Sequence, residues 1–134
     1  MIEFEYRQER LRTGEIILRP VAKAYLMRRE GEWIAEYFYV DSGADYTLIP
    51  YRMGRFLGLE EIASEIKEMR GIGGVIAVRF ADVPMRIETY QFDCTIAWAQ
   101  IERVPFLLGR EKVFEHFDVI FQQRRKKPIF IWQG

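Results

Sequence analysis

The chain has 134 residues, 49% hydrophobic and 15% aromatic, which suits one globular domain with a single core and is too short for two. Lys plus Arg and Asp plus Glu both number 20, so the overall charge gives no indication of a nucleic-acid or anionic-membrane partner. The lone cysteine, Cys94, excludes an intrachain disulfide and a zinc site built from several thiolates, and a buried free thiol is its better interpretation. We therefore expect one domain over residues 1–134.

The N-terminal segment, residues 1–12, alternates apolar and charged side chains and lacks the continuous apolar core of a secretory signal. No uninterrupted apolar stretch approaches the ~20 residues that a membrane span needs. We expect a soluble, cytoplasmic protein with no membrane partner.

Short strands are predicted along most of the chain, because β-branched and aromatic residues recur in runs bounded by Gly, Pro and charged pairs. The first two runs, residues 16–28 and 33–40, flank Arg29-Glu30-Gly31-Glu32, whose glycine and polar content is typical of a hairpin turn. Further strands are expected over residues 65–70, 75–80, 85–88, 92–99, 105–108, 117–122 and 129–132.

Two short helices are expected. Residues 50–57 have a proline at their start and Gly58 just past their end, the asymmetry typical of helix termini. Residues 110–116 follow Gly109 and place apolar side chains on one face at helical spacing. Many short strands with few helices predict an all-β domain, closed or sandwich-like.

Two other features are interpreted as structural. Arg124-Arg125-Lys126-Lys127 lies between two expected strands, so a solvated connection is favoured over a nucleic-acid contact. His116 is the one histidine, and the sequence groups no further ligands around it, so we expect no metal site.

The most informative segment is residues 39–50. The apolar run of residues 34–40 leads directly into Asp41-Ser42-Gly43, where glycine lets the backbone turn tightly. Asp, Ser and Gly are also ordinary turn residues, because their side chains and backbone suit local hydrogen bonding. Apolar residues on both sides, including Leu48-Ile49, favour a carboxylate held at the end of a buried strand.

Val40-Asp41-Ser42-Gly43-Ala44-Asp45 resembles the active-site signature of the retropepsin-like aspartic proteases, which have Asp-Thr/Ser-Gly-Ala after an apolar strand. Two later segments match in the family's order. Gly71-Ile72-Gly73-Gly74 resembles the flap tip, and Phe106-Leu107-Leu108-Gly109-Arg110 resembles the apolar-Gly-Arg turn before a short helix. Serine stands at position 42, where threonine is commoner, and the residues before Trp33 have no detailed match.

The resemblance implies a closed β-barrel of the retropepsin type and an aspartic endopeptidase that is active as a homodimer. Two carboxyl groups that share one proton activate a water in such enzymes. Because the chain has one Asp-Ser-Gly, the second Asp41 must come from a second copy across a two-fold axis. Ser42 would hydrogen-bond across that axis, and Gly43 would orient backbone groups toward the carboxylates. No cofactor is implied.

The resemblance also assigns residues that surround the catalytic pair. Gly71, Ile72, Gly73, Gly74 and Val75 would form a flap that closes over an extended peptide, which adds to the protein as a strand. Ala44 and Asp45 would contact substrate beside the catalytic turn. Asp45 and Arg110 would form an ion pair that braces this turn, because the planar guanidinium can hold a carboxylate with two hydrogen bonds.

Three alternatives stay open at this point. The C-terminal apolar run, residues 129–132, is either interleaved with a partner's strands or an edge strand within one chain. The protein is either a peptidase or a dimeric peptide-binding or scaffolding module of the same fold with little or no turnover. A nucleic-acid-binding KH module also has a Gly-x-x-Gly loop, but that loop joins helices, and strand-like runs flank it here.

Overall fold

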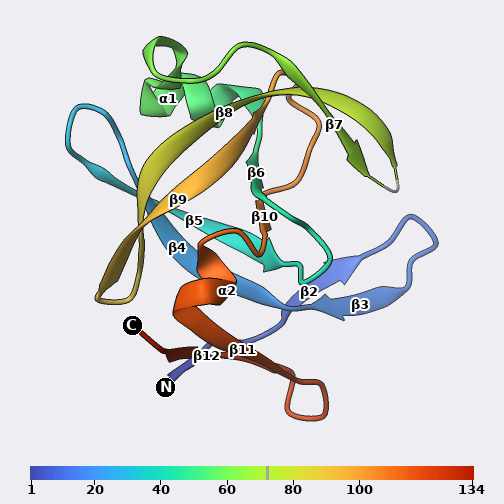
Figure 1. Ribbon diagram of the computed structural model, residues 1–134. Helices are drawn as coiled ribbons and strands as arrows, with labels where there is room; N and C mark the ends of the chain where they lie inside the picture. The colour runs from blue at the N-terminus through green and yellow to red at the C-terminus, as the bar shows by residue number, and fades with distance from the viewer. Residues whose placement is uncertain (72) are drawn as a thin grey trace.

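The computed structural model describes residues 1–71 and 73–134 and is mostly β, with a few short helices (Figure 1). This agrees with the predicted fold class. The elements in chain order are β1 (Ile2–Glu3), β2 (Arg7–Arg10), β3 (Ile16–Arg19), β4 (Val21–Met27), β5 (Trp33–Val40), β6 (Thr47–Ile49), α1 (Tyr51–Leu57), the 3-10 helix η1 (Leu59–Glu61), β7 (Lys67–Gly71), β8 (Gly74–Ile87), β9 (Tyr90–Ala99), β10 (Leu107–Leu108), α2 (Val113–His116), β11 (Phe117–Gln122) and β12 (Lys127–Trp132).

The main sheet has seven strands in the order β4-β5-β10-β6-β9-β8-β7. Most neighbours are antiparallel, but β10 runs parallel to β5 and β6 runs parallel to β9. The first strand in this order, β4, also pairs with β8, at Tyr25–Arg86 and Leu26–Met85. This extra pairing brings the sheet round on itself, which is what the expected barrel would require.

A smaller sheet joins the two ends of the chain in the order β1-β12-β11 (Figure 1). The predicted C-terminal strand is therefore neither an edge strand nor interleaved with a second chain here, because β1 and β11 occupy both of its sides. Backbone bonds beyond β1, from Phe4 N–H to Pro128 O at 3.1 Å and from Tyr6 N–H to Lys126 O at 3.0 Å, lengthen this pairing.

The core lies between the main sheet, the helices and the terminal sheet. Alternate residues of β9 point the same way, so Phe92, Cys94, Ile96 and Trp98 all enter the larger core cluster. Side chains of both helices and of the terminal sheet join the same cluster, among them Leu57, Val113, Phe117 and Phe130. Full burial of a large apolar side chain of this kind contributes about 1.5–3 kcal/mol to the free energy of folding.

The first predicted helix is found to within one residue, and the second is found with a later start. α1 begins after Pro50 and ends at Leu57, and its C-cap is Gly58, whose φ of 82° is the left-handed conformation that glycine adopts most easily. α2 begins at Val113, later than the predicted residue 110, because Lys112 has a φ of 69°, in the left-handed region that a right-handed helix does not include.

Two strand predictions were wrong, and both involve proline. The run of residues 16–28 is divided at Pro20 into β3 and β4, which pair with different strands. The runs of residues 75–80 and 85–88 form one strand, β8, which continues through Pro84. On the β4 side, β8 is paired only at Met85 and Arg86. Pro84 is tolerated there because no pairing with β4 requires its missing N–H group.

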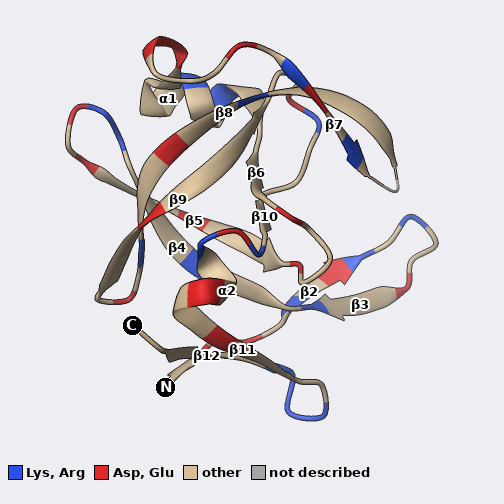
Figure 2. Ribbon diagram, in the orientation of Figure 1, with Lys and Arg blue, Asp and Glu red and all other residues tan. Residues whose placement is uncertain are grey.

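Lys and Arg residues and Asp and Glu residues are spread along most of the elements, with both signs interspersed (Figure 2). Residues 124–126 of the basic run lie in the turn between β11 and β12, as predicted for a solvated connection, and Lys127 begins β12. None of the helices among the described residues is both long enough and apolar enough to cross a membrane.

Candidate active site

Asp41 follows the last residue of β5, and the backbone on both sides of β5 fixes its position. The parallel pairing of β10 with β5 sets Leu108 beside Val40. Asp41 N–H donates to Leu108 O at 3.0 Å, and Val40 N–H donates to Pro20 O at 3.0 Å. The start of the Asp-Ser-Gly turn is therefore held by segments from two distant parts of the chain.

The turn itself is closed by the aspartate. Gly43 N–H donates to Asp41 Oδ1 at 2.9 Å, and Ala44 N–H donates to the Asp41 carbonyl at 3.2 Å. Asp41 is half-buried, whereas Ser42 and Gly43 are exposed. The Ser42 hydroxyl forms no hydrogen bond with any part of the chain that the structure describes. One carboxylate oxygen is thus used by the turn, and the exposed hydroxyl is available to another molecule.

The turn before α2 packs directly on the loop after Asp41. A Cβ atom at Gly109 would lie 2.3 Å from the backbone carbonyl of Tyr46, so no larger residue fits without backbone movement. Gly109 N–H donates to Thr47 Oγ1 at 3.1 Å, and Thr47 is 0% exposed. The buried hydroxyl and the glycine therefore fix the distance between β6 and β10. No sequence pattern pointed to Thr47, because a threonine in a strand is unremarkable by itself.

Arg110 and Asp45 also meet here. Their side chains form an ion pair, and Arg110 N–H donates to Ala44 O at 2.9 Å. The two side chains are 53% and 74% exposed, so water screens the charges and the pair contributes only about 0–1 kcal/mol to stability. The hydrogen bond from Arg110 N–H to Ala44 O therefore links the turn before α2 to the turn after β5 more strongly than the exposed ion pair does.

A hollow of about 530 Å³ lies at the C-terminal end of β5, next to Asp41. Its lining comes from β5, from β10, from two prolines and from two charged residues, Asp41 and Arg19. The lining residues are Arg19, Pro20, Tyr39, Val40, Asp41, Pro105 and Leu107. The hollow thus combines apolar walls with one carboxylate and one guanidinium. Arg19 and Tyr39 were missed at the sequence level, because their approach depends on long-range folding.

The hairpin of β2 and β3 borders this hollow through Arg19, and Glu9 links Arg19 to Tyr39. The Tyr39 hydroxyl donates to the Glu9 carboxylate. Arg19 Nε lies 3.1 Å and Arg7 Nε 3.4 Å from Glu9 oxygens, and both guanidinium groups lie near the Tyr39 ring. The Tyr39 hydrogen bond, followed by the two arginines, lowers the pKa of Glu9. We call Glu9, Arg7, Arg19 and Tyr39 the Glu9 cluster.

The glycine-rich segment lies at the turn between β7 and β8, where Gly71 pairs with Gly74. The predicted hairpin is therefore present, and its flanking strands contradict the KH interpretation. Gly73 and Gly74 have open space where a Cβ would be, and Val75 is 48% exposed. Ile72 lies outside the described residues. No hydrogen bond or ion pair within residues 1–71 and 73–134 joins this turn to Asp41.

Cys94 is buried as predicted, and its thiol lies 3.9 Å from Thr47 Oγ1. Burial raises the pKa of the thiol to about 12, although the bond to Thr47 opposes this shift. Cys94 is therefore a protonated, apolar-like core residue next to the Thr47 contact.

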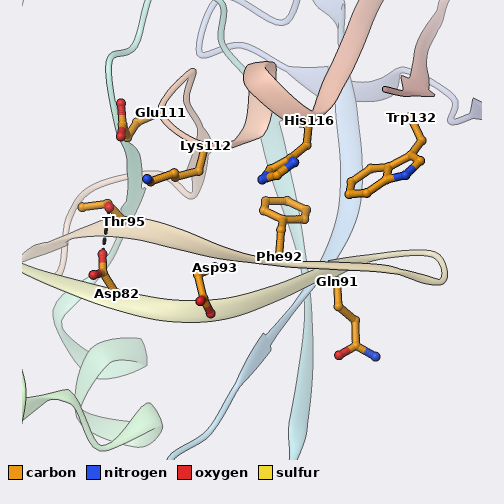
Figure 3. Close-up of a pocket in the computed structure, with 9 residues that line it drawn as sticks. All are labelled: Asp82, Gln91, Phe92, Asp93, Thr95, Glu111, Lys112, His116 and Trp132. Carbon is orange, nitrogen blue, oxygen red and sulfur yellow. Dashed lines mark hydrogen bonds between the residues drawn. The ribbon is translucent and has the colours of Figure 1, made fainter. Parts of the chain in front are cut away.

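A second hollow of about 590 Å³ contains none of the predicted site residues (Figure 3). Asp82, Asp93 and Glu111 border it, and Asp82 accepts a hydrogen bond of 2.8 Å from the Thr95 hydroxyl. His116 stacks on Trp132 at 5.3 Å between ring centroids and faces Phe92. Among the described residues no group of three or more His, Cys, Asp or Glu side chains is arranged to hold a metal.

The fold has relatives among solved structures. A retropepsin-like aspartic protease from Rickettsia conorii superposes with a TM-score of 0.63 and 16% identity, covering 96% of this chain and 99% of that chain. The EIAV protease complexed with the inhibitor HBY-793 superposes with a TM-score of 0.50 and 15% identity, covering 72% of this chain and 86% of that chain. No protein-family model and no curated protein matches the sequence. At identities this low the superpositions show a shared fold and no more, and this fold is the one that the motifs predicted.

Proposed function

Starting from the retropepsin-like fold of this chain, we propose that the protein is an aspartic endopeptidase whose active site forms between two copies. Asp41 of each copy supplies one carboxyl group. The observation that carries the proposal is the placement of Asp41: a half-buried carboxylate at a strand end, held by Leu108, beside a hollow with apolar walls. A simple surface turn would need neither the buried strand nor the hollow.

The chemistry follows from bringing two Asp41 carboxyls together. Like charges held close cannot both ionise, so the pair shares one proton. The ionised carboxyl takes a proton from a water, whose oxygen attacks the peptide carbonyl carbon, while the neutral carboxyl donates its proton to the carbonyl oxygen. Return of a proton to the amide nitrogen then lets the C–N bond break. No metal or cofactor takes part in these steps.

A homodimer is part of this proposal, because one chain supplies one such carboxyl. The exposure of Ser42 and Gly43 supports it, since a two-fold axis beside the turn would bury both and give the Ser42 hydroxyl an acceptor. Interleaving of the C-terminal strand would be more costly, because β12 already has partners on both sides. The outer edges of β1 and β11 could instead extend the sheet to a second copy.

The remaining predicted roles belong to the same proposal. The turn of residues 71–75 acts as a flap, and Gly71 and Val75 place its ends against an extended peptide. Ala44 and Asp45 contact that peptide beside the catalytic turn. Arg110 keeps Asp45 in place, with the Arg110 backbone bond to Ala44 as the second support. A cytoplasmic location stays a prediction of the sequence.

The test is cleavage of an unfolded protein at mildly acidic pH by the parent and by Asp41→Asn. We expect cleavage by the parent, inhibition by a transition-state inhibitor of aspartic proteases, and loss of at least about a thousandfold in Asp41→Asn, since removing a central catalytic group commonly costs that much. Asp93→Asn is the matched control, because Asp93 borders the other hollow. Equal rates for Asp41→Asn and the parent would refute the catalytic assignment. Peptide binding without cleavage would favour the scaffolding module.

A further inference from the structure

The hairpin of β2 and β3, residues 7–19, is attached to the rest of the chain on one face only. Its two strands pair with each other and, within residues 1–71 and 73–134, with no other strand. The side-chain hydrogen bond and the ring contacts that attach it all go to Tyr39, from Glu9, Arg7 and Arg19. A two-stranded ribbon with so few contacts is marginally stable in water. A further surface to pack on would therefore stabilise it.

The opposite face of the hairpin is exposed and partly apolar. Leu18 pairs with Gln8 and Ile16 pairs with Arg10, so these four side chains share the face that points away from Glu9. Ile16 is 50% and Leu18 is 42% exposed, and neither belongs to an apolar core cluster. Exposed apolar side chains on a ribbon with two open edges are what a partner chain covers.

The place of the hairpin in the fold indicates which partner covers it. β3 ends immediately before Pro20, whose carbonyl accepts the 3.0 Å bond from Val40 N–H, and Asp41 is the next residue. The hairpin projects from the body on the same side as the loop that follows β5 (Figure 1). A two-fold axis beside Asp41 therefore passes close to the base of the hairpin, and the hairpin of each copy extends toward the second copy.

The second copy presents a complementary hollow near the same axis. This hollow has a volume of about 460 Å³ and lies between the loop after Asp41 and the turn before α2. Its lining residues are Asp45, Tyr46, Arg110, Glu111, Phe114 and Glu115. Three carboxylates against one guanidinium make it acidic, whereas the hairpin has four arginines against two glutamates. Tyr46 and Phe114 are only partly buried and provide its apolar surface. We call it the acidic hollow.

Resting on the proposed function, we infer that the β2–β3 hairpin is an arm that clasps the second copy of the dimer in its acidic hollow. Ile16 and Leu18 of the arm pack against Phe114 of the second copy. Arg12, which is exposed at the tip of the hairpin, lies against Glu115 of the second copy. Two-fold symmetry gives two such arms in each dimer, so every contact of the arm is made twice. The arm adds affinity between the copies and touches no reacting atom.

The first test is the dissociation constant of the dimer, measured by sedimentation over a dilution series at low ionic strength. Ile16→Ser/Leu18→Ser should raise this Kd at least about a hundredfold, because four apolar side chains in each dimer lose their contacts. At concentrations far above its own Kd, the variant should have the kcat of the parent. Ile62→Ser/Ile66→Ser is the matched control, because these side chains are 45% and 63% exposed between η1 and β7, and its Kd should stay within about threefold of the parent.

An exchange of charges tests where the arm lies. Arg12→Glu and Glu115→Arg should each raise the Kd several-fold, because each variant places like charges together across the interface. A chain with both changes restores an ion pair of opposite polarity, so its Kd should return close to that of the parent. Losses that simply add in the double variant would show that the two residues do not meet, and would overturn the assignment of the acidic hollow.

The failures of the two proposals can be told apart. An equal Kd for the parent and Ile16→Ser/Leu18→Ser, in a protein that dimerises and cleaves peptides, overturns the arm and leaves the peptidase intact. A parent that stays monomeric at every concentration, or cleavage that persists in Asp41→Asn, overturns the proposed function and the arm with it.

Discussion

Replacing Gly109 by alanine tests whether close packing of the two turns positions Asp41. The added Cβ would lie 2.3 Å from the carbonyl carbon and oxygen of Tyr46 and 2.9 Å from the nitrogen of Thr47. These are backbone atoms, so the clash cannot be relieved by rotating a side chain. Overpacking of this kind costs about 1–3 kcal/mol. If the backbones separate, the buried bond from Gly109 to Thr47 is lost as well, and an unsatisfied buried group costs about 1–3 kcal/mol.

We therefore expect Gly109→Ala to lower the free energy of unfolding by about 2–6 kcal/mol, a large part of the ~5–15 kcal/mol of an ordinary domain. The assay is urea unfolding followed by tryptophan fluorescence, at one fixed protein concentration because a dimer's stability depends on it. Gly71→Ala is the matched control: nothing lies within 4 Å of its Cβ position, and a shift within about 0.5 kcal/mol is expected. Equal urea midpoints for Gly109→Ala and this control would refute the packing argument.

Four other predictions concern the surroundings of the site. Thr47→Val should destabilise the protein by about 1–3 kcal/mol in urea, because the buried glycine amide loses its acceptor; an unchanged midpoint would show that the bond is dispensable. Asp45→Asn should cost no more than about 1 kcal/mol, since its ion pair with Arg110 is exposed, and a larger loss would mean that the pair is a main support of the fold. Cys94 should be unreactive toward a thiol reagent at pH 8 in the folded protein and reactive in urea, because its thiol is buried with a pKa of about 12; rapid labelling of folded protein would contradict this. The lowered pKa of Glu9 contributes stability that is present above the ordinary value of 4.5 and is lost as pH falls below it, so Glu9→Gln should flatten the acid side of the stability profile, and an unaltered profile would contradict the assignment.

The Asp41-Ser42-Gly43 turn was predictable because its signals are local. β5 has the bounds that its apolar and aromatic run indicated, and Asp41-Ser42-Gly43 directly follows it. The hairpin of β7 and β8 and the end of α1 at Gly58 were found for the same reason, since glycine marks positions where a turn or a left-handed residue is needed.

Proline shows where local signals fail. Pro20 divides one predicted strand and Pro84 does not, although both interrupt apolar runs. The difference is that the chain changes its partner strand at Pro20, from β2 to β5, whereas β8 stays paired with β9 on both sides of Pro84. Sheet order is a property of the whole fold, so the residue type alone could not separate the two cases.

The residues around Asp41 that the sequence did not reveal are held by long-range contacts. Glu9 reaches Tyr39 across 30 positions, and Gly109 reaches Thr47 across 62. Neither Glu9 nor Thr47 belongs to a recognisable motif, so only the folded chain brings them to the site. The second apolar cluster, which includes Leu48 and Val78, likewise forms only when strands distant in the sequence pack together in the folded sheet.

The mass of the active species tests the central claim most directly, because the proposed chemistry needs two chains. Sedimentation equilibrium of the parent at the pH of maximal activity should give about twice 16.0 kDa, and specific activity should fall on dilution as that species dissociates. A particle of 16.0 kDa that cleaves peptides with a specific activity independent of concentration would contradict the claim.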